Sequence, residues 1–116
     1  MIKKLAVLFV LSMISGCGEK QLPKTAPKVG TFEEIVAKSS CMACHQAGSP
    51  MKFPSWEEIA GKYQGDKGAE IFLINKIAKG GSGSWGKMDM PPYPELSVAE
   101  RRTVVQGILA PPSKDR

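Results

Sequence analysis

The chain has 116 residues, enough for one small domain at most. Its formal net charge at pH 7 is +5, and loss of the two lysines in its first stretch would lower that charge to +3. No stripe of basic and aromatic residues accompanies the charge, so the composition gives no reason to expect a nucleic-acid partner.

Residues 1–16 have the pattern of a signal peptide. A pair of lysines precedes the apolar run 5–14, which is too short to cross a bilayer as a helix. The segment ISGC at residues 14–17 resembles a bacterial lipobox. We therefore expect a lipoprotein signal peptide over 1–16 and a lipidated Cys17 that anchors the mature protein on the periplasmic side of a bacterial membrane. An ordinary signal peptide that leaves Cys17 as a stray thiol is the alternative.

Residues 17–30 are polar and contain two prolines, which indicates a flexible tether that starts at the lipid anchor. The thirteen residues after the cysteine reach at most about 43 Å when fully extended. The folded unit is then expected over residues 31–116, as a monomeric head held clear of the lipid surface.

Three capping-box patterns, each a Ser or Thr with Glu three residues later, predict helix starts at Thr31, Ser55 and Ser97. The first helix is expected over about 31–40 and the second through about Tyr63. A third helix should end at Lys79, before a glycine pair, and its expected apolar side comprises Ile71, Phe72, Ile74, Ile77 and Ala78.

The last helix should end before a Pro-Pro pair, with an inward side formed by Val98, Val105, Ile108 and Leu109. No segment alternates convincingly as a strand would. The sequence therefore predicts an all-α domain of four short helices and long loops. About 80 ordered residues provide only a marginal apolar core, so we expect the chain to need a bound group to fold well.

The run Cys41-Met42-Ala43-Cys44-His45 is the most specific motif, and it holds the only histidine of the chain. Cys-x-x-Cys-His is the attachment pattern of a c-type haem. Both thiols add across the vinyl groups of the porphyrin, and the adjacent imidazole reaches the iron. The motif predicts one covalent haem c held by Cys41 and Cys44, with His45 as the proximal iron ligand.

Two other interpretations of the motif have less support. A redox dithiol would be expected in a βαβ context, which this sequence lacks. A structural zinc site needs four ligands, usually Cys or His, and beyond this motif only Cys17 remains.

The second iron ligand decides the function, and the sequence offers Met90, Met88 and Met51 for it. Met90 precedes a Pro-Pro pair that keeps its backbone extended, which favours Met90 as a fixed distal ligand. Met88 lies on the same side of an extended chain, so spacing alone does not exclude it. Met90 as a simple core side chain is the structural alternative.

Three motifs together resemble the small bacterial monohaem class I cytochromes c. They are CMACH at 41–45, FPSW at 53–56, and GSWG at 83–86 followed by MPP at 90–92, and the resemblance covers about residues 31–110. It implies a class I cytochrome c fold wrapped around one haem, with His45 proximal and Met90 distal. It also implies that the Pro54 carbonyl accepts the His45 ring N–H, which would fix the orientation of that ring.

The resemblance assigns two further residues to the haem propionates. Trp85 matches the tryptophan that bonds a propionate in this family. Lys76 stands where these proteins often have an arginine, so it would act as a point charge instead of a bidentate donor. Phe53 stands where a glycine is common before the proline.

The implied function is one-electron transfer between redox protein partners, with no substrate turnover by the chain itself. Lys76, Lys79 and Lys87 flank the methionine segment and are candidates to contact acidic partners. Two alternatives remain open at this stage. One is a haem sensor or enzyme whose distal methionine can be displaced, and the other is a fixed electron-entry subunit of a membrane oxidoreductase.

Overall fold

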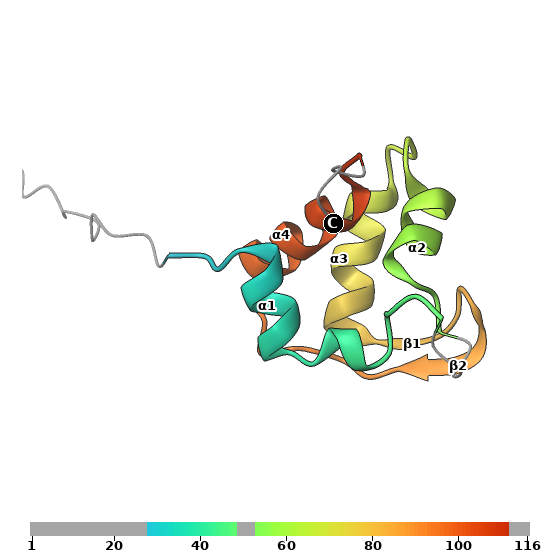
Figure 1. Cartoon of the computed structure of the whole chain (residues 1–116), viewed down its shortest axis with the longest axis horizontal. Coiled ribbons are helices and arrows are strands. Elements are labelled where there is room, and N and C mark those ends of the chain that lie inside the picture. The colour runs from blue at the N-terminus through green and yellow to red at the C-terminus, as the bar shows by residue number, and fades with distance from the viewer. Residues whose placement is uncertain (1–27, 49–52, 112–116) are drawn as a thin grey trace, which may run out of the picture.

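A computed structural model describes residues 28–48 and 53–111. It contains four α-helices (Figure 1): α1 (Phe32–Lys38), α2 (Trp56–Tyr63), α3 (Ala69–Lys79) and α4 (Val98–Leu109). A single 3₁₀ turn, Cys41–Ala43, follows α1. The all-α prediction is confirmed. The expected signal peptide, Cys17, most of the tether, Met51 and the last five residues lie outside the described residues.

Three of the four helices begin at the predicted capping boxes. The hydroxyls of Thr31, Ser55 and Ser97 each accept from the amide of the glutamate three residues later, and each glutamate carboxylate accepts from the amide of the capping residue. Each box satisfies backbone donors that a helix start leaves without partners. The starts of α1, α2 and α4 follow directly from these local signals.

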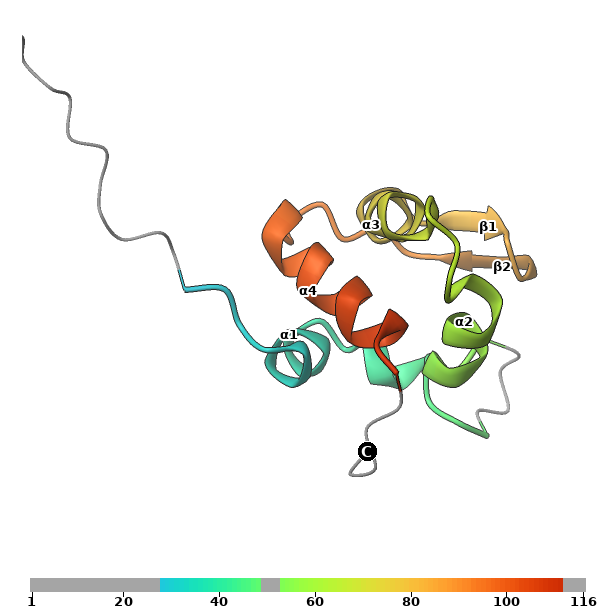
Figure 2. The ribbon, with the colours of Figure 1, turned by 90° about the horizontal axis from the view of Figure 1, so that it is seen from above.

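Helix α4 is the element around which the others pack. It contacts α1, α2 and α3, and it crosses between α1 and α3 when the molecule is seen from above (Figure 2). The buried core lies along these contacts and comprises Ile35, Val36, Ile59, Leu73, Ile74, Ile77, Leu96, Val104, Val105 and Ile108. The expected inward positions Val105 and Ile108 are confirmed.

Three expected core positions are wrong. Ile71, Phe72 and Val98 are 61%, 45% and 53% exposed. Ile71 and Phe72 each lie about 130° from the centre of the buried stripe of α3, at 3.6 residues per turn. Val98 is the first residue of α4, and it is exposed although it lies two turns before the fully buried Val105.

A two-stranded antiparallel hairpin corrects the expectation that the chain has no strand. Strands β1 (Gly81–Gly83) and β2 (Gly86–Met90) pair Gly81 with Met90 and Gly83 with Gly86, with an irregularity between the two pairs. Glycine has low strand propensity, so β1 gives no sequence signal. None of the helices in the described part of the chain is long and apolar enough to cross a membrane.

Candidate cofactor site

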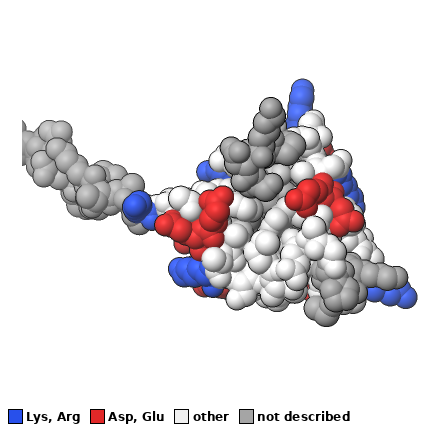
Figure 3. Space-filling view, in the orientation of Figure 1, with Lys and Arg blue, Asp and Glu red and all other residues white. Residues whose placement is uncertain are grey.

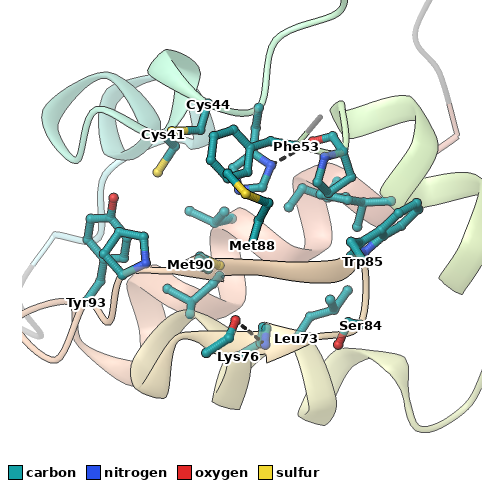
Figure 4. Close-up of a pocket in the computed structure, with 18 of the residues that line it drawn as sticks. Cys41, Cys44, Phe53, Leu73, Lys76, Ser84, Trp85, Met88, Met90 and Tyr93 are labelled. Carbon is teal, nitrogen blue, oxygen red and sulfur yellow. Dashed lines mark hydrogen bonds between the residues drawn. The ribbon is translucent and has the colours of Figure 1, made fainter. Parts of the chain in front are cut away.

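One large cavity brings the predicted site residues together. It contains about 1150 Å³ of space free of protein atoms, partly open to solvent, between the Cys41–His45 segment on one side and β2 with α3 on the other (Figure 4). The sequence-predicted residues that line it are Cys41, Cys44, His45, Pro54, Lys76, Trp85, Met88 and Met90. Mostly apolar walls with a few polar groups suit a large flat apolar ligand.

A short hydrogen bond holds one nitrogen of the His45 ring. Its Nδ1 lies 2.7 Å from the carbonyl oxygen of Pro54, the residue just before the capping box of α2. A carbonyl can only accept, so Nδ1 carries the proton and Nε2 keeps its lone pair. The geometry leaves His45 with one nitrogen able to bind a metal.

The two cysteines are free thiols on the same wall of the cavity. The His45 amide donates to the Cys41 carbonyl at 3.0 Å, which closes the turn that brings the imidazole beside the thiols. Burial raises the pKa of the Cys41 thiol, and the neighbouring Cys44 adds to the rise against an opposing backbone hydrogen bond. A redox dithiol needs a lowered thiol pKa, so this environment disfavours that interpretation.

A zinc site has no support in the described residues. Residues 28–48 and 53–111 contain no group of three or more His, Cys, Asp or Glu side chains placed to hold a metal ion. A structural zinc ion needs four such ligands. The imidazole and two thiols therefore fit attachment of an organic group better than a tetrahedral ion.

Both methionines of β2 line the cavity, but their surroundings differ. Met90 is partly buried against the apolar core, whereas Met88 is 51% exposed. Gly80, at φ 65°, lies so close to the backbone of Met90 and the two following prolines that a Cβ there would overlap the Met90 carbonyl oxygen. The backbone at Met90 is thus fixed by close packing as well as by the prolines that follow it.

Lys76 and Trp85 also face the cavity, each with a polar partner from the protein. The Lys76 ammonium group donates to the Gly81 carbonyl at 2.7 Å and less closely to that of Ser82, at 3.4 Å. Trp85, at the turn of the hairpin, is 37% exposed. The sequence-predicted propionate residues therefore belong to the hairpin and to the helix that supports it.

Lys62 is a residue that the sequence reasoning missed. Its ammonium group lies 4.5 Å from the centre of the Trp85 ring and donates to the Ser84 carbonyl at 2.5 Å, which ties α2 to the hairpin turn. No sequence signal links these residues, because 22 positions separate Lys62 from Ser84.

Trp56 and Tyr93 were also missed as members of the site. Trp56 lines the cavity and stacks on His45. Tyr93 lines the cavity beyond the prolines, and its amide donates to the Ile77 carbonyl at 2.9 Å. Burial raises the pKa of the Tyr93 phenol, with smaller contributions from the thiols of Cys41 and Cys44 and from Glu95. The position of Trp56, two residues after Pro54, was the available signal.

The family model and the similar proteins found by comparison all point to the same family. A family model described as cytochrome c matches residues 33–109. Cytochrome c-551 of Azotobacter vinelandii is 40% identical over 79 residues, which cover 68% of this chain and 95% of that protein. Cytochrome c-552 of Hydrogenobacter thermophilus is 40% identical over 78 residues, covering 67% of this chain and 79% of that protein.

The fold also matches a solved structure. Cytochrome c552 of Nitrosomonas europaea superposes with a TM-score of 0.60 at 35% identity, over 66% of this chain and 95% of that one. The family match extends from α1 to the last residue of α4. The cavity and all its predicted residues lie within this range.

Proposed function

This chain belongs to the cytochrome c family and is a one-electron carrier with one covalently attached haem c, and from that premise we propose how its residues hold the group and use it. Cys41 and Cys44 form the two thioether links. His45 supplies Nε2 as the proximal ligand, and Met90 supplies its sulfur as the distal ligand.

The contact between His45 and Pro54 is the observation that carries this assignment. The 2.7 Å hydrogen bond places the proton on Nδ1, so that Nε2, beside the two thiols, keeps the lone pair that can bind iron. Met90 lines the same cavity from β2, and its partial burial and packed backbone hold the sulfur in place. The less buried Met88 is the weaker candidate for the distal ligand.

When bound, the haem iron would supply one-electron redox chemistry. His45 and Met90 would both bind the iron, so no ligand position would be left for a substrate. Methionine ligation also favours a higher reduction potential than harder donors do. The chain therefore acts as a carrier with no substrate turnover of its own.

Lys76 and Trp85 are proposed to hold the haem propionates. The Lys76 ammonium group already donates to the Gly81 and Ser82 carbonyls, and the third of its N–H groups remains for an acceptor at the cavity. Lys62 fixes Trp85 by lying over its ring.

The redox partners are proposed to dock near the hairpin through small transient interfaces. Lys79, at the end of α3, and Lys87, in β2, are exposed and lie near Lys76, so they provide positive charge for an acidic partner surface. Figure 3 shows basic side chains at the outer edges of one face of the head and two groups of acidic side chains on that face. Charge reversal at these lysines should slow electron transfer at low salt and matter less at high salt.

The head is proposed to be tethered to a bacterial membrane on the periplasmic side through lipidated Cys17. The support is the ISGC segment after the apolar run, together with the need to export a chain that receives a covalent haem c. A Cys17→Ser variant should appear in the soluble periplasmic fraction and lose incorporation of labelled fatty acid. Wild-type protein that is itself soluble and unlabelled would contradict the anchor.

Extraction with acidified organic solvent tests whether the haem is covalently attached to the protein. Wild-type protein should keep its colour in the protein pellet, and the double variant Cys41→Ala/Cys44→Ala should release it or fail to acquire it.

The reduced wild-type protein should also bind carbon monoxide slowly or not at all. Rapid carbon monoxide binding would show an available axial position and would favour a sensor or an enzyme.

A further inference from the structure

The indole of Trp56 stacks on the imidazole of His45. The ring centroids lie 4.7 Å apart with an interplanar angle of 25°. Trp56 is the first residue of α2, directly after the capping Ser55, so the capping box fixes its backbone. The imidazole is therefore restrained twice, by the Pro54 carbonyl at Nδ1 and by the indole over its face.

The indole is itself held on two sides. Its Nε1–H donates to the sulfur of Met42 at 3.0 Å, and Met42 lies between the two attachment cysteines. The Phe32 ring of α1 meets it edge to face, with centroids 5.9 Å apart and an interplanar angle of 72°. Such aromatic pairs are worth about 0.5–1.5 kcal/mol beyond the area they bury.

We propose that Trp56 is a positioning residue that sets the plane of the proximal imidazole and protects its hydrogen bond to Pro54. The stack opposes rotation of the His45 ring about its Cβ–Cγ bond, and such rotation would break the bond to Pro54. The Nε1–H bond to Met42 couples the indole to the same Cys-x-x-Cys segment that carries the histidine. This inference rests on the proposed role of His45 as a ligand.

The test is the exchange rate of the His45 Nδ1 proton with solvent, measured by NMR on the reduced, haem-loaded protein. Trp56→Leu removes both the stack and the bond to sulfur, and it should raise the rate about fivefold, from the magnitude of one aromatic pair. Trp56→Phe and Met42→Leu each remove only the bond to sulfur and keep an aromatic ring, so they should raise the rate less.

In the oxidised protein, Trp56→Leu should also change the order of the haem methyl resonances, which reports the orientation of the imidazole plane. Ile71→Ala is the control, because Ile71 is 61% exposed on α3 and is not among the residues that line the cavity. This variant should leave both readouts at their wild-type values.

The proposal is overturned if Trp56→Leu shows wild-type exchange and methyl order, or if Ile71→Ala raises the exchange rate equally. If Trp56→Leu takes up no haem, wild-type exchange in both Trp56→Phe and Met42→Leu overturns it. Failure of the proposed function gives a different result, because the wild-type protein would then lack a haem-shifted His45 signal altogether.

Discussion

At the scale of single residues, the proposed position of Lys76 beside the haem can be tested through its charge. Its ammonium group lines the cavity and bonds the Gly81 carbonyl. A positive charge near the iron stabilises the reduced state, because that state carries one less positive charge. Lys76→Met should therefore lower the reduction potential by an energy on the order of 1 kcal/mol, roughly 40 mV for one electron.

Spectroelectrochemical titration measures this change. Lys79→Met is the control on the same helix, since Lys79 is exposed and does not line the cavity. It should shift the potential far less. Equal shifts in the two variants would show that Lys76 acts only through the net charge of the protein.

The residues of the motifs could be predicted from the sequence, whereas those that support them could not. Cys-x-x-Cys-His and Met-Pro-Pro each define a chemical role within a few positions. Trp56 and Lys62 act through contacts with Met42 and Ser84, which are 14 and 22 positions away. Such pairs form only when the fold is complete, so a single sequence does not reveal them.

At the scale of elements, the capping box of α4 should make the stability of the folded protein fall at low pH. The backbone amide and the hydroxyl of Ser97 donate to the Glu100 carboxylate and lower its pKa from the ordinary 4.5, and Lys38 adds a smaller decrease against slight burial. Because the pKa is lower in the folded state, this stabilisation is complete above about pH 4.5 and is lost as the pH falls through the folded value.

The Tm of haem-loaded Glu100→Gln should therefore fall less than that of wild type between pH 5 and pH 3, since glutamine keeps a cap but does not titrate. Glu57→Gln, in the first turn of α2 but outside its capping pair, is the matched control. Parallel pH profiles for Glu100→Gln and wild type would contradict a role of the capping box in acid stability.

The packing of α1 on α4 requires a glycine at position 107. A Cβ there would overlap the ring of Phe32. Alanine is better than glycine in a free helix by about 1 kcal/mol, but overpacking costs about 1–3 kcal/mol. Gly107→Ala should therefore destabilise the haem-loaded protein in denaturant unfolding.

Gly61→Ala provides the opposite expectation. Gly61 lies in α2, and a Cβ there would meet nothing within 4 Å. This variant should stabilise the protein by about 0.5–1 kcal/mol. A stabilising Gly107→Ala would show that Phe32 can move away at little cost.

Three helix starts could be predicted because each capping box consists of two residues, three positions apart, whose side chains bond each other's backbone amides. The hairpin could not, because Gly81–Gly83 pairs with β2 through backbone groups while its side chains carry no pattern. The Lys76 ammonium group supports this strand by bonding two of its carbonyls. The exposed Val98, Ile71 and Phe72 show that helical periodicity sets a face but not its width.

At the scale of the whole molecule, the cavity explains why the haem should be needed for folding. The core residues of α2, α3 and α4 that line it include Ile59, Leu73, Ile77, Val104 and Ile108. These side chains are already buried, but the sides that line the cavity would gain apolar packing partners only from a large apolar group placed there. A domain of this size has little stability to spare.

The chain without haem should therefore show no cooperative thermal transition by circular dichroism, whereas the haem-loaded protein should unfold in one step. Expression in a host that lacks haem attachment provides the haem-free chain. A cooperative, native-like transition in that chain would show that the apolar core alone specifies the fold.

Which methionine binds the iron decides the function, since the proposed ligation by His45 and Met90 would leave the iron no position for a substrate. The most direct measurement is the ferric absorption spectrum of wild type, Met90→Ala and Met88→Ala. We predict a sulfur-ligation band in the red for wild type and Met88→Ala, and its loss in Met90→Ala. A band that persists in Met90→Ala, or that disappears in Met88→Ala, would contradict the account.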